Sequence, residues 1–424
     1  MSDELKVLIA AEHASARFGG EAALPLHYFR VMRSRGIPVW LVTHARTRDE
    51  LTALYPGDGR IFYIEDTVLH RLMWQIGKRL PAQIAYFTVG FVSRLSTQLS
   101  QRQVVRRLVR ECGITVIHQP MPVSPREPSM LFGFGVPVVI GPMNGGMDYP
   151  PAFRRNRGGL ERFLLDLGRT SSAALNWLMP GKRRAATLLV ANQRTREALP
   201  AGVCKNVVEL VENGVDLTLW QAPPAAPDAP DGAAVTFVFM GRLVDWKAVD
   251  LLLRAFALAR TGAPMRLWVL GDGPERAALE ALASELGTGP TGEDAVGGVY
   301  FAGWLAQSAC AQRVRLADCL VLPSLLECGG AVVLEAMSMG KPVIATAWGG
   351  PLDYLDPNCG VLVPPESRTS IVERFAEAML EMARSGAKRR HMGACGLAKV
   401  RSEYDWELKV DRIMSIYADA RGGA

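Results

Sequence analysis

The residues with the clearest chemical potential lie in one passage of the C-terminal half. Seven residues separate Glu327 from Glu335, and Gly329 and Gly330 lie between them. The pattern predicts a strand, then a loop carrying Glu327, then a helix that begins near Ala331. A helix N-terminus presents free N–H groups and partial positive charge, and glycines let an anion approach the backbone. We therefore expect a phosphate site here, with Glu335 able to accept hydrogen bonds from ribose hydroxyls.

The same spacing also allows a purely structural explanation. Glu335 would then form a salt bridge, and the two glycines would form a tight turn. The elements that surround the passage, and the other motifs of the chain, have to decide between the two interpretations.

Length and composition set the framework for these residues. A chain of 424 residues predicts two domains, and 49% hydrophobic with 21% charged residues excludes wholesale disorder. Seven cysteines without a CxxC pair form neither a zinc nor a disulfide framework, which favours a reducing, cytosolic setting. The acidic N-terminus lacks the features of a signal peptide, and prolines and glycines interrupt the longest charge-free stretch, so neither secretion nor a transmembrane segment is expected.

Strand-like and helical segments alternate in both halves of the chain. The strand-like segments are Leu5–Ala11, Pro38–Thr43, Ile114–His118, Pro137–Ile140 and Thr187–Ala191, then Thr236–Met240, Arg266–Leu270, Val299–Ala302, Cys319–Leu322 and Pro342–Ala345. This alternation predicts an α/β fold with two Rossmann-like domains facing a cleft, residues 1–208 and 209–403. Ligands of such sheets bind beyond the carboxyl ends of the strands, so the loops after strands are the candidate sites.

Further motifs occur in a fixed order around the Glu327 passage. They are Asn213-Gly-Val-Asp216, Gly241-Arg242-Leu243 with Lys247, Gly271-Asp272-Gly273-Pro274, Ala336, Gly340, Pro342-Val343 and Gly349-Gly350. Together with the two glutamates they resemble the GT-B glycosyltransferases, specifically the large retaining family 4 (glycosyl transferases group 1). The resemblance is strong over residues 205–365 and weaker across the N-terminal half.

The resemblance implies that the C-terminal half binds a nucleotide-diphosphate sugar, of the UDP or GDP type, and that the N-terminal half binds the acceptor. Arg242 and Lys247 would hold the diphosphate, Glu335 the ribose and Glu327 the transferred sugar. The donor loop would be completed by Gly329, Gly330, Ala331 and Val332. Two cations and a helix N-terminus would stabilise the departing diphosphate, whereas a solvated pair is the alternative for the two cations. No Asp-x-Asp motif occurs, so the resemblance favours metal-independent transfer without a cofactor.

In the N-terminal half, the resemblance assigns three places to the site. Gly19 and Gly20 would lie near the donor phosphate, and His118 would face the donor sugar as a catalytic residue, through its ring or its backbone carbonyl. A satisfied structural histidine is the alternative for His118. The C-terminal helix, residues 404–420, would cross back to this domain.

The loop Asn144-Gly145-Gly146 could hydrogen-bond acceptor hydroxyls, although a plain loop is equally compatible. The chain departs from the family at Gly329, where an aromatic residue is frequent, and at Ala248, where a glycine follows the lysine. The first departure leaves the identity of the donor sugar open.

The function implied is retaining transfer of a hexosyl unit to a hydroxyl, with a lipid-linked or polysaccharide-precursor glycan as acceptor. A front-face attack is the hypothesis for retention, because no carboxylate is clearly placed as a nucleophile. The alternative is a GT-B enzyme without transfer, such as a nucleotide-sugar epimerase. A dinucleotide-dependent oxidoreductase, suggested by Gly271 and Gly273, is weaker because Arg276 occupies the third glycine position.

The net charge of +6 and pI near 9.0 suit an acidic ligand, a phosphate-bearing substrate or an anionic membrane surface, and no base-reading module indicates nucleic acid. Basic and aromatic residues are interleaved in the N-terminal half. They are Arg102, Arg106, Arg107, Arg110, Arg154, Arg155, Arg157, Lys182, Arg183 and Arg184, with Trp74, Phe87, Phe91, Trp177 and Met179. We expect peripheral attachment to the cytoplasmic membrane face, with ordinary solvated helices as the alternative.

Overall fold

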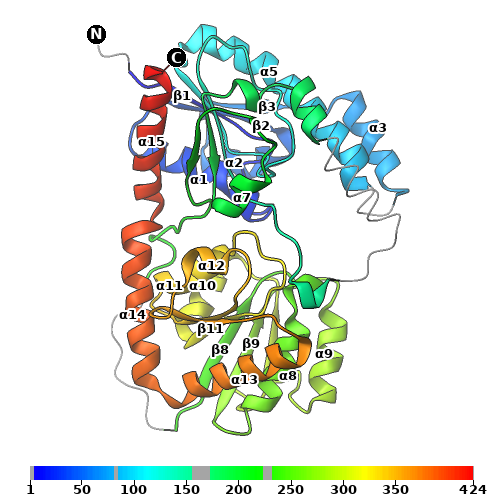
Figure 1. The fold of residues 1–424 in the computed structure, drawn as a ribbon, viewed down its shortest axis with the longest axis vertical. Helices are drawn as coiled ribbons and strands as arrows, with labels where there is room; N and C mark the ends of the chain where they lie inside the picture. The colour runs from blue at the N-terminus through cyan, green and yellow to red at the C-terminus, as the bar shows by residue number, and fades with distance from the viewer. Residues whose placement is uncertain (1–3, 81–84, 155–171, 223–231, 424) are drawn as a thin grey trace. The chain divides into compact units, whose positions relative to one another are not determined.

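A computed structural model describes residues 4–80, 85–154, 172–222 and 232–423 (Figure 1). The chain divides into two compact units. The N-terminal unit comprises Met1–Gly146, Gly158–Glu212 and Lys409–Ala424, and the C-terminal unit comprises Met147–Arg157 and Asn213–Leu408. The sequence predicted residues 1–208 as one N-terminal domain. In the structure, Met147–Arg157 belongs to the C-terminal unit.

The N-terminal unit is built on a parallel sheet whose described strands run in the order β3-β2-β1-β4-β5-β6-β7. The strands are β1 Val7–Ala10, β2 Val39–His44, β3 Ile61–Ile64, β4 Val116–Gln119, β5 Val138–Met143, β6 Thr187–Val190 and β7 Val207–Glu209. The helices are α1 Gly20–Ser34, α2 Arg48–Leu54, α3 Val68–Gly77, α5 Phe91–Cys112 and α7 Gln193–Ala198, with short turns η1 Ala45–Thr47, η2 Tyr86–Gly90 and η4 Lys182–Arg184.

The C-terminal unit contains a parallel sheet in the order β10-β9-β8-β11-β12-β13. Its strands are β8 Val235–Met240, β9 Met265–Leu270, β10 Val299–Gly303, β11 Cys319–Leu322, β12 Val343–Thr346 and β13 Gly360–Val363. Its helices are α8 Val249–Ala259, α9 Arg276–Glu285, α10 Gln307–Leu316, α11 Ala331–Ser338, α12 Pro351–Tyr354, α13 Arg368–Arg384 and α14 Gly386–Glu403, with turns η3 Pro151–Phe153 and η5 Asp245–Lys247. Helix α15, Trp406–Gly422, begins in this unit and continues into the N-terminal unit.

Both strand orders are of the doubly wound, Rossmann-like type, and the predicted α/β fold class is confirmed. Every residue of β8 is buried, as expected of a central strand covered on both faces. In each sheet the order of the strands reverses beside the first strand of the unit, between β1 and β4 and between β8 and β11. The loops that follow these strands meet at one edge, where doubly wound folds bind ligands.

The sequence analysis did not identify the three strands β3, β7 and β13, which lie at edges of the two sheets. Their residues are less completely buried than those of central strands such as β1 and β8. Helix α1 begins at Gly20, directly after Gly19.

Candidate functional site

Two loops meet at the strand-order reversal of the C-terminal unit. Lys247 lies in turn η5 after β8, and Glu327 lies in the loop after β11. The Lys247 ammonium forms an ion pair with the Glu327 carboxylate, and both side chains are largely buried, at 17% and 12% exposure. A second bond between the loops, from the Leu325 N–H to the Trp246 carbonyl at 2.8 Å, holds them together. The structure therefore brings together two residues that the sequence analysis assigned to one donor site.

The Glu327 loop is held in place by the loop after β12. The Gly350 N–H donates to the Glu327 carbonyl at 2.7 Å. A Cβ atom on Gly349, which has φ +72°, would lie 2.3 Å from that carbonyl oxygen, and one on Gly350 would lie 2.1 Å from the Gly329 oxygen. Only glycine allows this approach, so Gly349 and Gly350 support the loop.

Helix α11 starts directly after this loop. Gly330, with φ +74° and ψ +48°, precedes its first residue, and no side chain caps the helix. Ala331 and Val332 in its first turn are only partly buried. The first N–H groups of α11 are therefore available to an anion.

Glu335 lies in the second turn of α11 and is partly buried. Burial raises the pKa of its carboxyl group to about 7, and a hydrogen bond with the Gln307 side chain opposes this shift. A carboxylate in this position can gain hydrogen bonds from a ligand that brings hydroxyl groups, because few protein groups satisfy it.

Arg242 follows β8 and is exposed. Within the described parts of the chain, no hydrogen bond or ion pair of its side chain is found. The two predicted phosphate cations thus differ: Lys247 is held by Glu327, whereas Arg242 is available to a ligand.

Ala248 takes the position after Lys247 in which the family carries glycine. It has φ +51° and ψ +38°, and among the described residues it is the one non-glycine residue with a positive φ. The left-handed conformation costs an L-residue about 1–2 kcal/mol. The sequence showed the missing glycine, but only the backbone shows why glycine is suited to this place.

Gly271 and Gly273, which suggested a dinucleotide-binding turn, serve close packing of two loops. A Cβ atom on Gly271 would lie 1.9 Å from the Gly241 oxygen, and one on Gly273 would lie 2.2 Å from the Leu243 oxygen. These glycines are explained by the approach of the loops after β8 and β9, so they no longer favour an oxidoreductase.

In the N-terminal unit, His118 is a core residue. It is 0% exposed, its Nε2 lies 2.6 Å from the Gly141 oxygen, and its Nδ1 lies 2.7 Å from the Tyr417 hydroxyl. Burial lowers the pKa of His118 to about 4. Both ring nitrogens are thus engaged within the unit, which favours the structural alternative for His118. A catalytic role of His118, through its ring or its backbone carbonyl, stays a prediction.

The loop predicted to bind acceptor is also engaged internally. The Asn144 side chain is buried, donates to Glu212 at 2.7 Å and accepts from Thr195 at 3.4 Å. A Cβ atom on Gly145 would lie 2.8 Å from Pro125, and one on Gly146 would lie 2.6 Å from Ala198. The geometry therefore favours the plain-loop alternative for these three residues.

Gly19 and Gly20 are exposed, and a Cβ atom on either would meet no atom within 4 Å. Gly19, with φ +99°, precedes α1 without a capping side chain. These two predicted residues lie at the open edge of their unit, directly after the loop that follows β1.

A group of charged residues beside this glycine loop was not predicted from the sequence. Arg94 of α5 pairs with Glu127 at 2.6 Å, and both side chains are largely buried. Burial raises the pKa values of Glu12 and Glu21, while the Arg94 charge lowers them. Glu12 follows β1 and Glu127 follows β4, so the rule that sites lie after central strands could have identified them.

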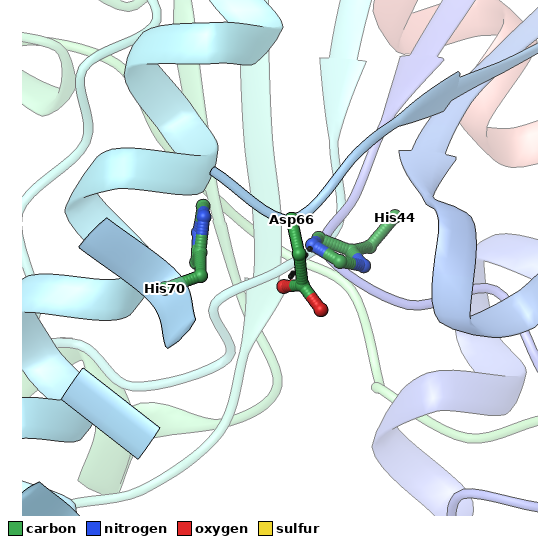
Figure 2. A group of neighbouring side chains, drawn as sticks. All are labelled: His44, Asp66 and His70. Carbon is green, nitrogen blue, oxygen red and sulfur yellow. Dashed lines mark ion pairs between the residues drawn. The ribbon is translucent and has the colours of Figure 1, made fainter. Parts of the chain in front are cut away.

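Figure 2 shows a second polar group, His44, Asp66 and His70, whose ligand atoms lie within 4.8 Å of one another. The His44 Nδ1 accepts from the Arg46 N–H, and the His70 Nδ1 accepts from the Thr67 N–H. Each neutral ring then carries its proton on Nε2, which has no lone pair for a cation.

The third member, Asp66, pairs with Arg46 at 2.7 Å. These bonds explain the group as a structural network.

Only some of the residues predicted to form a basic and aromatic surface are exposed. Lys182 is 0% exposed, donates to the carbonyls of Ser124 and Pro125 at 2.9 Å each, and has a pKa lowered by burial to about 7. It holds a loop and cannot contact lipid. Met179 is buried as well, whereas Trp74 and Trp177 are exposed. Arg155 and Arg157, and the side chain of Phe87, lie outside what the structure describes.

The comparisons agree with this architecture. Residues 228–395 match the model of the family described as glycosyl transferases group 1. A D-inositol 3-phosphate glycosyltransferase of Segniliparus rotundus is 30% identical over 51% of this chain and 48% of its own length. A GDP-mannose-dependent monoacylated alpha-(1-6)-phosphatidylinositol monomannoside mannosyltransferase of Corynebacterium glutamicum is 29% identical over 41% and 45%. The chain thus spans about half the length of the curated relatives it matches.

Among solved structures, sucrose-phosphate synthase from Thermosynechococcus elongatus has a TM-score of 0.67 at 18% identity, covering 99% of this chain and 100% of its own. This likeness extends over both units and identifies the fold as that of the GT-B glycosyltransferases. The region that matches the glycosyl transferases group 1 model, residues 228–395, lies within the C-terminal unit. In the described residues, no helix is both long and apolar enough to cross a membrane.

Proposed function

We propose that the protein is a retaining glycosyltransferase that moves a hexosyl unit from a nucleotide-diphosphate sugar to a hydroxyl group. The observation that carries the proposal is the meeting of Lys247, Glu327 and the uncapped start of α11 at the strand-order reversal of the C-terminal unit. The family match of this unit supports it. The UDP or GDP type of donor is part of the proposal.

The diphosphate would bind between the first N–H groups of α11 and the side chains of Arg242 and Lys247. Lys247 would exchange Glu327 for a phosphate oxygen, which frees the Glu327 carboxylate to accept hydrogen bonds from the sugar. The leaving diphosphate gains negative charge, and preorganised cations and N–H groups stabilise that charge without needing to reorganise. Transfer would therefore proceed without a metal ion, and activity is expected to survive chelators.

Retention of configuration would follow from attack on the face that the diphosphate leaves. The acceptor hydroxyl would approach on that side, and a phosphate oxygen would take its proton. NMR of the product anomer tests this step, because an inverted centre is incompatible with it.

The acceptor is proposed to be a lipid-linked or polysaccharide-precursor glycan, bound by the N-terminal unit at the open edge near Gly19 and Gly20. Peripheral attachment to an anionic membrane surface is part of this proposal. Helix α3 supports it, because it exposes Leu72, Trp74 and Ile76, and the Lys78 ammonium lies 3.4 Å from the centre of the Trp74 ring. Residues 67–93 contain three cations and no acidic residue.

Flotation with vesicles tests the membrane proposal. The protein should float with anionic vesicles at low salt, and Trp74→Ser should reduce the floating fraction. Leu316→Ser, which removes an exposed leucine of the C-terminal unit, is the control. Protein that stays at the bottom in all samples contradicts attachment.

Thermal stability with UDP, GDP, ADP and NAD tests the transferase proposal itself. A ligand at 100 times its dissociation constant adds about 2.7 kcal/mol to stability, which gives a readable shift. One nucleoside diphosphate should stabilise the native protein and lose its effect in Glu335→Ala. A response to NAD alone would reopen the oxidoreductase alternative, and sugar interconversion without acceptor would favour an epimerase.

A further inference from the structure

A cavity of about 410 Å³ lies within the C-terminal unit, on the side of helices α8 and α9. Its volume falls in the range of about 300–1,000 Å³ that is usual for small-molecule sites. Figure 1 shows α8 and α9 close to each other, and the two helices are in contact. The cavity is lined at their N-terminal ends and by the segment Tyr149–Arg154. None of the residues assigned above to the donor lines it.

The lining combines aromatic side chains with carboxylates. Tyr149 and Phe153 are partly buried and line the cavity together with apolar side chains such as Leu279 and Leu325. Aromatic faces carry negative potential, which attracts the C–H groups of a sugar ring. Carboxylate oxygens are acceptors only, so they suit a ligand that donates many hydrogen bonds.

The charges of the lining disfavour an anionic ligand. Its two guanidinium groups are engaged with acidic partners, Arg368 with Asp250 and Arg154 with Asp148 at 3.6 Å. In contrast, no hydrogen bond or ion pair within the described residues involves the Glu275 carboxylate. An anion would meet an unpaired carboxylate and no unpaired cation, whereas a hydroxyl group would find an acceptor.

The cavity shares its walls with the proposed donor site. Asp245 lines the cavity, and Lys247 belongs to the same three-residue turn η5. Leu325 lines it too, in the loop that carries Glu327, and its N–H bond to Trp246 joins the two loops. A ligand in the cavity therefore contacts the two loops whose other residues form the Lys247–Glu327 pair.

From this arrangement we infer that the cavity binds a neutral, hydroxyl-rich oligosaccharide, as an extended subsite for the acceptor glycan in the C-terminal unit. The inference rests on the proposed function, because it takes the transferred sugar to be held by the same two loops. Its content is specific: part of the acceptor contacts Tyr149, Phe153 and Glu275 of the C-terminal unit.

Saturation-transfer NMR on the full chain tests the inference, with maltotriose and α-1,6-mannotriose as neutral probes and glucose 6-phosphate as the anionic one. At millimolar concentration at least one trisaccharide should receive saturation, and the anionic probe should not. Ala152→Trp fills the cavity from its exposed wall and should weaken trisaccharide binding at least tenfold. Ala281→Trp, the same change on the exposed face of α9, should leave binding unchanged.

Two further results separate this inference from the proposed function. Glu335→Ala should lose the response to nucleoside diphosphate while retaining trisaccharide binding. Absence of saturation for both trisaccharides, or equal binding by Ala152→Trp and the native chain, overturns the subsite while the nucleotide response stands. Trisaccharide binding in a protein that responds to no nucleoside diphosphate overturns the assignment of the cavity to an acceptor.

Discussion

The two units share the strand order around their first strand but differ in the polar residues that lie at their central strands. At the edge of β8 and β11, Arg242 is exposed, Lys247 has a single ionic partner, and α11 begins uncapped. At the edge of β4 and β5, His118 and Asn144 point into the core and are hydrogen-bonded there. The same topology thus supports an open polar edge after β8 and β11 and a closed one after β4 and β5.

The difference shows that position after a central strand is not enough to make a site. A polar side chain whose hydrogen bonds are all made within the protein holds the fold, and it can contribute to binding only by breaking them. By this criterion the N-terminal unit keeps its open edge at Gly19 and Gly20, after β1, and not after β4.

The largest effect is expected for the charged pair of the open edge. Lys247→Ala should lower the rate of nucleoside diphosphate release from the donor by about 10²–10³-fold, because one donor to the developing charge is lost. Coupled detection of the released nucleotide measures it. Arg254→Ala, which removes an exposed cation of α8, should keep the native rate. Equal rates for all three proteins would show that the diphosphate binds elsewhere.

At the closed edge after β4 and β5, a substitution is expected to lower stability much more than the reaction rate. His118→Ala should destabilise the protein by about 3 kcal/mol, because it leaves a cavity and removes the partners of Gly141 and Tyr417. The folded variant should retain its rate to within a few-fold. Calorimetry measures the stability and the release assay measures the rate. A stable variant with a greatly reduced rate would indicate that His118 takes part in catalysis.

The contrast between the two edges also shows which features of the fold and of the site could be predicted from the sequence. The apolar strands alternating with helices predicted the fold class. The motifs around Glu327 and Lys247 predicted that these two residues share one site. The ion pair itself needed the strand order, because it joins loops after strands that are distant in the sequence.

The sequence could not predict which polar side chains form hydrogen bonds with residues that are distant along the chain. His118 bonds to Tyr417, 299 positions away, and Asn144 bonds to Glu212, 68 positions away. Lys182 looks like a surface cation in a basic run, yet two carbonyls of a remote loop bury its ammonium group. Such bonds depend on tertiary packing, and no local pattern records them.

A third prediction uses the titration of Glu335. Its pKa of about 7 lies above the ordinary value of 4.5, so the folded protein holds this proton more tightly than the unfolded chain. Stability therefore falls as pH rises from about 4.5 through 7, and this loss is absent in Glu335→Gln. The unfolding temperatures of the native protein and Glu335→Gln should coincide near pH 4. Above pH 7 the variant should unfold at the higher temperature. A constant difference across this range contradicts the shifted pKa.

The same group should make donor binding depend on pH in the opposite sense. The carboxylate is the better acceptor for ribose hydroxyls, so the affinity for the preferred nucleoside diphosphate should fall as pH drops below 7. Glu335→Gln should bind more weakly at pH 8 and show only the pH dependence of the nucleotide phosphates themselves. Isothermal titration at several pH values separates the two contributions.

The smallest effect concerns the backbone that presents Lys247. Ala248→Gly should stabilise the protein by about 1 kcal/mol or less, because glycine adopts φ +51° without a Cβ clash, while its greater freedom in the unfolded chain offsets part of the gain. Ala255→Gly, in the interior of α8 where the backbone is helical, should destabilise by a similar amount. If both changes destabilise equally, Ala248 is not strained. If Ala248→Gly stabilises and leaves the release rate unchanged, the left-handed turn holds Lys247 at the open edge with either residue, and the alanine costs stability without tuning the site.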